Sequence, residues 1–201
     1  MKLAFDLSGL QPRRVCATVL LDELKIDRIV AVDCAMGSAI AASLAAMRPD
    51  RILGRIMANL ELKLDDDARA RLTQRAHRLE RHGPESALPE GVDRIFNGID
   101  DPKRKARYLA FFRQLDGRCA AAYIRGFLTL DITDALGRMR CLTLLAAAAN
   151  YTLSGHDTTT KIAVLPPGAE HVVFAGASHF GPYQAPQEFA ATVAAFLAKI
   201  S

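Results

Sequence analysis

The sequence predicts an α/β fold in which a mostly parallel sheet is covered by helices. Short apolar runs alternate with helical patterns near both ends of the chain, which is typical of parallel strands joined by crossover helices. A helical block over residues 63–138 interrupts that alternation. We therefore expect a sheet core built from residues 1–62 and 139–201, with the helical block as a cap on one side of it.

Periodicity places the individual elements of this core. A strand ends at 3–5 before a loop at 6–11, and Val15, Val19, Leu20 and Leu24 recur at helical spacing. The predicted elements are, in order, strand 3–5, helix 13–25, strand 28–32, helix 36–47, strand 51–59, strand 141–146, helix 157–165, strand 171–174 and a last helix that begins near Pro186. Turn residues predict cap loops around 83–84, 88–91 and 100–102.

Composition narrows the classes of function. The net charge of +4 is small and basic residues are mixed with acidic ones, without a motif for nucleic-acid binding. Four separated cysteines give neither zinc-ligand spacing nor a disulfide framework. The longest small-apolar stretch, 35–47, is shorter than the about 20 residues that span a bilayer. Because Asp6 follows the first residues so closely, we do not expect a secretory signal in this segment. We expect a cytoplasmic protein that binds a small molecule, without nucleic acid or membrane as partner.

A tight turn between a strand and a helix is the most informative stretch. Ala35, Gly37 and Ser38 crowd it with small side chains, as an abrupt passage from strand to helix requires. The segment 28–38 resembles the nucleophile elbow of the α/β-hydrolase family, Gly-x-Ser-x-Gly. Asp33 stands at its first glycine and Ala35 at its serine.

The alanine closes the covalent route, because a methyl group cannot attack a carbonyl carbon. Natural divergence explains Ala35 better than an engineered change, since Asp33 and Cys34 also depart from the family pattern. Cys34 is the alternative nucleophile, with a thiolate that the following helix N-terminus would favour. Its position is shifted by one residue, however, and a buried structural thiol is the preferred interpretation.

The resemblance also assigns the partners of the missing serine. Segment 176–180 matches the family's histidine loop, which makes His179 equivalent to the catalytic base. In the segment that carries the family's acid, Asn150 falls on the acid position, and an amide does not stabilise an imidazolium by charge. Asp157 could substitute if its loop folds back, or it is simply an acid at a helix N-terminus.

By the same resemblance, residues 5–9 correspond to the family's fourth strand and the loop after it. The first strands of the fold would then be missing, and an unpaired buried strand edge is costly. Three explanations stay open: a start further upstream, a rearranged strand, or self-association as a homo-oligomer.

Segment 123–139 resembles 3-oxoadipate enol-lactonases and related carboxylesterases. This implies a small carboxylate ester or lactone as ancestral substrate, hydrolysed without cofactor or metal. His179 would be the base and the Met36 N–H an oxyanion donor. With Ala35 at the nucleophile position, we expect the activity to be weak or lost. The alternatives are a non-catalytic protein that binds a small ligand and a cofactor-free lyase or dioxygenase that uses His179 as base.

Overall fold

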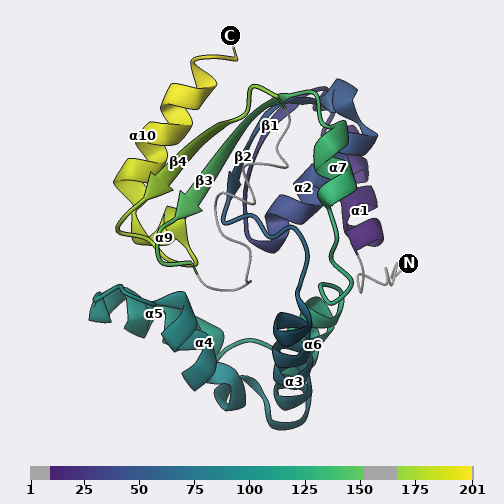
Figure 1. The fold of residues 1–201 in the computed structure, drawn as a ribbon. Helices are drawn as coiled ribbons and strands as arrows, with labels where there is room; N and C mark the ends of the chain where they lie inside the picture. The colour runs from purple at the N-terminus through teal and green to yellow at the C-terminus, as the bar shows by residue number, and fades with distance from the viewer. Residues whose placement is uncertain (1–9, 152–166, 201) are drawn as a thin grey trace.

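The computed structural model describes residues 10–151 and 167–200. Figure 1 shows a twisted sheet between two helical layers, with a separate group of helices beyond one edge of the sheet. The elements are α1 (Leu10–Glu23), β1 (Ile29–Cys34), α2 (Met36–Met47), β2 (Ile52–Ala58), α3 (Asp66–His82), α4 (Leu88–Ile95), α5 (Pro102–Phe112), α6 (Gly117–Arg125), α7 (Thr133–Arg138), β3 (Leu142–Ala148), β4 (Glu170–Phe174), α9 (Gly181–Gln184) and α10 (Pro186–Leu197), with short 3-10 turns at Pro49–Arg51 and Pro84–Ala87.

The four described strands form one parallel sheet in the order β1-β2-β3-β4. β2 and β3 are buried along almost their whole length, because helices cover both faces of the sheet. A strand buried on both faces is a continuous apolar run rather than an alternating one. The sheet therefore confirms the predicted α/β class.

Alternate side chains of β2 point to two separate cores. Met57 packs among residues of α1, α2 and α7, whereas Ile56 packs among residues of α10. A Cβ placed on Gly54 would lie 2.6 Å from Ile200 Cδ1, so the C-terminal segment lies directly on the β2 backbone. Figure 1 shows the same division, with α1, α2 and α7 on one face and α10 on the other.

Helix α1 uses a different face from the one that its apolar spacing predicts. Val19, Leu20 and Leu24 are exposed, while Leu21 is buried against the α2 side of the core. A rotation by one position turns a helix by about 100°, and this rotation places Ala17 and Leu21 against the core. The predicted strand 3–5 and helix 157–165 lie outside the described residues.

Helices α3 to α6 share an apolar cluster of their own, which includes Leu79, Val92 and Phe112. Three of these helices begin at an aspartate whose carboxylate accepts a backbone N–H three residues later, which satisfies the helix end. The capping residues are Asp65, Asp101 and Asp116. The loop expected at 88–91 is wrong, because α4 begins at Leu88 and a proline in the first turn is compatible with a helix.

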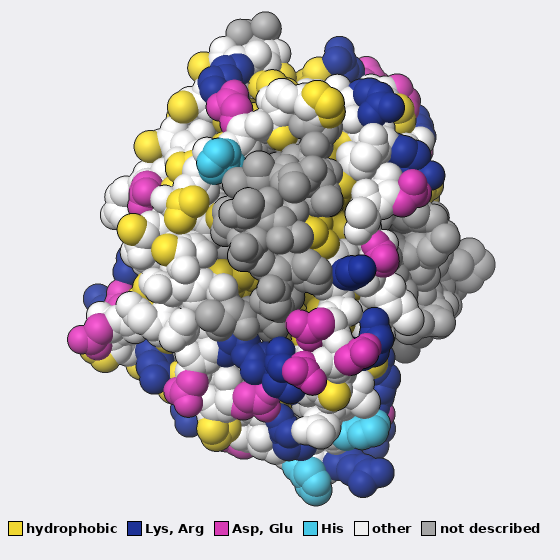
Figure 2. Space-filling model, in the orientation of Figure 1, with side chains coloured by type: hydrophobic (Ala, Val, Ile, Leu, Met, Phe, Trp, Pro, Cys, Tyr) yellow, Lys and Arg dark blue, Asp and Glu magenta, His cyan; other side chains and the backbone are white. Residues whose placement is uncertain are grey.

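Helix α7 packs with α2, since Ala135 and Leu136 belong to the same buried cluster as that helix. The division of the chain at 62/63 and 138/139 stays a prediction. On the face drawn in Figure 2, acidic and basic side chains are intermixed over the helices below the sheet. Among the described residues, no helix is long and apolar enough to cross a bilayer.

Candidate functional site

The turn after β1 has the backbone geometry of a strained elbow. Ala35 has φ 52° and ψ −118°, a combination that non-glycine residues rarely adopt. Its N–H donates to the Ala58 carbonyl at 2.9 Å, and the Ser38 N–H donates back to the Ala35 carbonyl at 3.0 Å. These bonds hold the chain as it passes from β1 into α2. Such strain, of roughly 1–3 kcal/mol, persists only where the surroundings fix it.

A buried ion pair lies beneath this elbow. Arg55 of β2 is fully buried, and its Nη2 lies 3.2 Å from the Asp33 carboxylate and 2.8 Å from the Ser38 carbonyl that it donates to. Burial raises the pKa of Asp33, and the charge of Arg55 opposes that rise. Asp33 therefore has a structural partner on the next strand.

Asn59, the residue after β2, holds the histidine loop (176–180) at the carboxyl end of the sheet. Its side-chain nitrogen donates to the carbonyls of Ser178 (2.8 Å) and His179 (2.6 Å). Its side-chain oxygen accepts the Ala148 N–H at 3.0 Å. The carboxyl ends of β1, β2 and β3 therefore meet the histidine loop, which is where ligands bind in open α/β sheets.

His179 lies in this loop as a partly buried neutral imidazole. Its ring stacks on Tyr151 with centroids 5.3 Å apart and meets Phe180 edge-on at 4.6 Å. Burial and, to a smaller extent, the charges of Arg75 and Arg94 together lower the pKa of His179 to about 4. A neutral imidazole can accept a proton, although a pKa this low makes it a weak base.

No acid orients this imidazole among the residues that the structure describes. Asn150 follows β3 at the expected place, but its side chain donates to the Ala175 carbonyl at 3.5 Å and lies against Gly98. Its own carbonyl accepts the Ser178 hydroxyl at 3.1 Å. Asp157 lies outside the described residues. The roles of these two residues as acid stay predictions.

Tyr151, whose ring stacks on His179, and the buried Glu61, which acts on Tyr151, were missed by the sequence interpretation. Glu61 is 1% exposed two residues after Asn59, and Tyr151 directly follows Asn150. Burial raises the pKa of Tyr151 well above its usual value, as do the charge of Glu61 and a hydrogen bond with it. Their position just after the strand ends is the signal that could have found them.

The cysteine of the elbow is a neutral thiol in this setting. The Cys34 Sγ lies 3.7 Å from the His179 carbonyl. Burial and, to a smaller extent, the charge of the neighbouring Asp33 together raise the pKa of Cys34 to about 12. The thiol therefore carries no thiolate near neutral pH, and thiolate is the nucleophilic form. Met36 is buried and is the first residue of α2. Its N–H therefore lies at the N-terminus of the helix.

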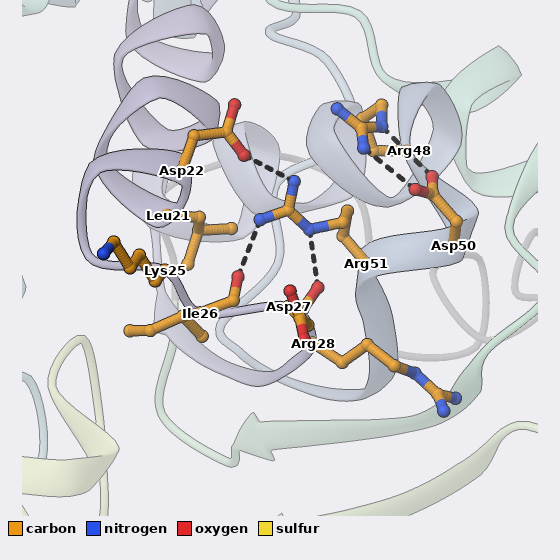
Figure 3. A pocket seen from close by; sticks show the side chains of 9 residues that line it. All are labelled: Leu21, Asp22, Lys25, Ile26, Asp27, Arg28, Arg48, Asp50 and Arg51. Atoms are coloured by element: carbon orange, nitrogen blue, oxygen red, sulfur yellow. Dashed lines mark hydrogen bonds and ion pairs between the residues drawn. The ribbon is translucent and has the colours of Figure 1, made fainter.

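A cavity of about 610 Å³ lies at the opposite edge of the sheet, before β1 and β2 (Figure 3). Arg51 fills its centre and donates to Asp22 at 2.6 Å and to the carbonyls of Ile26 at 2.6 Å and Asp27 at 2.5 Å. The central charge of this cavity thus already has its partners, and we place the candidate site at the elbow. Among the described residues, no group of three or more histidine, cysteine or carboxylate side chains could hold a metal ion.

No protein-family model and no curated protein sequence matches the chain. Solved structures do match its fold. A malate-bound thermophilic esterase from Thermogutta terrifontis aligns with a TM-score of 0.85 and 20% identity, over 96% of this chain and 73% of that one. An enol-lactonase from Burkholderia xenovorans gives 0.84 and 20%, over 94% and 73%. MGS-M2, an α/β-hydrolase enzyme from a Medee basin deep-sea metagenome library, gives 0.74 and 20%, over 94% and 72%.

Proposed function

Because the chain has the α/β-hydrolase fold, we propose that it binds a small carboxylate ester or lactone at the elbow, with hydrolysis weak or lost. The observation that carries this proposal is the strained backbone of Ala35 at the turn between β1 and α2. In the proposal, the methyl group of Ala35 takes the place of a nucleophilic hydroxyl at this turn. The esterase and the enol-lactonase among the structural neighbours support the substrate class. The malate bound to the esterase supports a carboxylate.

Any surviving hydrolysis proceeds without an acyl-enzyme in this proposal. The neutral His179 takes a proton from a water molecule, the water oxygen attacks the carbonyl carbon, and the Met36 N–H stabilises the oxyanion. The imidazolium then gives this proton to the alcohol oxygen as the ester C–O bond breaks, which releases acid and alcohol and returns His179 to its neutral form. Both the low pKa of His179 and the missing acid slow this route. Losing the acid alone costs a complete triad roughly four orders of magnitude in rate.

We expect Ala35→Ser to restore a labelled nucleophile. The new hydroxyl replaces a methyl hydrogen at the same strained position, so a fluorophosphonate probe should label this variant and not the parent. Hydrolysis of p-nitrophenyl acetate should rise by at least about tenfold, still far below a complete triad. Both gains should vanish in Ala35→Ser/His179→Ala. The matched control is Ala46→Ser, near the far end of α2, which should stay unlabelled.

Labelling of the parent protein would show that our assignment of the nucleophile position is wrong. A folded Ala35→Ser variant that gains neither label nor turnover would favour the second candidate, a non-catalytic ligand-binding protein. Two observations favour that candidate now: the methyl group of Ala35, and the lack of a hydrogen-bonded acid for His179 within residues 10–151 and 167–200.

A further inference from the structure

Three arginines from two cap helices converge on one turn of α4. Arg78 of α3 pairs with the Glu90 carboxylate, and the Arg94 Nη2 lies 3.6 Å from its other oxygen. Arg75 lies one helical turn before Arg78. A Cβ on Gly91 would lie 2.6 Å from both terminal nitrogens of Arg75, so that guanidinium presses against the α4 backbone. Of these three positive charges, only Arg78 and Arg94 lie within ion-pair distance of the Glu90 carboxylate.

Arg75 is the member of this cluster that lacks an anion. Within residues 10–151 and 167–200, no carboxylate lies within ion-pair distance of it. Its guanidinium carbon lies 5.6 Å from the centre of the Phe112 ring, and the side chain is half-buried. Burial lowers the pKa of Arg75, which shows that the charge is partly desolvated. A desolvated charge is costly without a counter-ion, and a bound anion offsets that cost.

The cluster adjoins the histidine loop. The Arg94 carbonyl accepts the Ser178 hydroxyl at 3.3 Å, one residue before His179. The Gln184 side chain, which follows the loop, donates to the Ile95 carbonyl at 2.8 Å. Both Arg75 and Arg94 act on the His179 ring through their charge. An anion held by these arginines would therefore lie within reach of a reaction at the elbow.

We infer that Arg75, with Arg94 beside it, forms an anion-binding subsite next to His179 that takes a carboxylate of the small ligand. This inference rests on the proposed function, and it assigns the ligand's charged group to named residues of the cap. A planar guanidinium fork matches the two oxygens of a carboxylate. The ester or lactone carbonyl would then point toward Ala35, while the charged end is held by α3 and α4.

Succinate is the probe, with succinamide as its uncharged analogue. Isothermal titration calorimetry should show that succinate binds the full chain and succinamide does not. Arg75→Met keeps the aliphatic stem over Phe112 and should weaken succinate binding by at least about tenfold, which is the loss of one charge-assisted contact. The matched control is Arg81→Met, on an exposed position of the same helix, which should bind as the parent does. Circular dichroism shows whether each variant is folded.

A second measurement does not depend on affinity. In an NMR titration of the imidazole signals, Arg75→Met should raise the pKa of His179, because a nearby positive charge is removed. Saturating succinate should raise the pKa of His179 in the parent, because the bound negative charge offsets the positive charge of Arg75. A pKa of His179 that responds to neither change would overturn the subsite.

Three further results would overturn the inference: equal binding of succinate and succinamide, equal loss in Arg75→Met and Arg81→Met, or tighter binding of inorganic phosphate than of succinate. The two proposals fail separately. Labelling of Ala35→Ser without any dependence of succinate binding on Arg75 would refute the subsite and keep the elbow. Succinate binding that depends on Arg75, in a protein whose Ala35→Ser variant is never labelled, would support the subsite and refute the assignment of the elbow.

Discussion

Asp33 and Arg55 show how one side chain beside the turn reaches into the core. Asp33 places a carboxylate behind the turn. Arg55 of β2 forms an ion pair with this carboxylate and also donates a hydrogen bond to the Ser38 carbonyl in the first turn of α2. The pair therefore fixes the strand, the next strand and the helix that together hold Ala35 in its strained conformation.

Removing one partner should be far worse than removing both. Asp33→Ala leaves the fully buried Arg55 without its counter-ion, and we expect a loss of roughly 3–5 kcal/mol in the free energy of unfolding. The double variant Asp33→Val/Arg55→Met should lose much less, since it leaves no buried charge. Urea unfolding followed by circular dichroism measures both.

The matched control is Asp50→Ala, which breaks the exposed pair with Arg48. Exposed ion pairs contribute little, so this variant should unfold almost as the parent does. Equal losses in Asp33→Ala and Asp50→Ala would refute a structural role for the buried pair.

At this scale the sequence predicts positions better than partners. It places Ala35 on a tight turn, because the run of small residues there has a clear steric reason. It does not predict the partner of Asp33, since Arg55 stands in an apolar strand where polar residues are rare. The sequence also does not predict the roles of Asn59 and Tyr151. Both residues follow strand ends, and only the folded sheet brings those ends together.

Among the elements, those with local start and stop signals are predicted most closely. The prediction for α2 matches the structure residue for residue, since a tight turn precedes it and Pro49 follows. The loop predicted at 88–91 is wrong because proline and glycine mark a turn as readily as a first helical turn. Position 91 has a tertiary reason for glycine that no local pattern reveals, because the terminal nitrogens of Arg75 lie only 2.6 Å from where a Cβ would be.

Two glycines of the cap and core helices should respond oppositely to alanine. A Cβ on Gly117, the first residue of α6, would lie 2.3 Å from the Leu79 carbonyl oxygen of α3. Gly117→Ala should therefore separate α3 from α6 and destabilise the protein by roughly 1–3 kcal/mol. Nothing lies within 4 Å of a Cβ on Gly137 in α7.

Gly137→Ala is thus the matched control, and its better helix propensity should stabilise the protein by up to about 1 kcal/mol. Thermal unfolding measures both variants. A melting temperature of Gly117→Ala at or above that of the parent would contradict the close contact between α3 and α6.

Across the whole molecule, the carboxyl end of the sheet and the group of helices α3 to α6 meet at the histidine loop. This loop accepts a hydrogen bond from Asn59 at the end of β2, and its Phe180 ring packs beside Tyr108 of α5. The sequence predicts the order of these segments along the chain. It does not predict that arginines of the cap set the charge around the histidine, because that depends on how α3 and α4 dock.

This placement gives the stability of the whole fold a pH dependence with a defined sign. The pKa of His179 falls from 6.5 to about 4 on folding, so the unfolded chain binds the extra proton first as the pH drops. Stability is therefore unaffected by this group above pH 6.5 and is lost progressively down to about pH 4. Over that window the loss is roughly 3 kcal/mol, of which about 2 kcal/mol falls between pH 7 and pH 5.

Urea unfolding of the parent and of His179→Gln at pH 7 and pH 5 isolates this contribution, since other titrating groups, such as Asp33, are common to both proteins. The parent should lose about 2 kcal/mol more than the variant. His171→Gln, on an exposed position of β4, is the control and should keep the parent's pH dependence. Because Arg75 contributes to the shift, Arg75→Met should reduce the loss. Equal losses in the free energy of unfolding between pH 7 and pH 5 in the parent and in His179→Gln would show that the imidazole is solvated. That result would also contradict a buried site at the elbow.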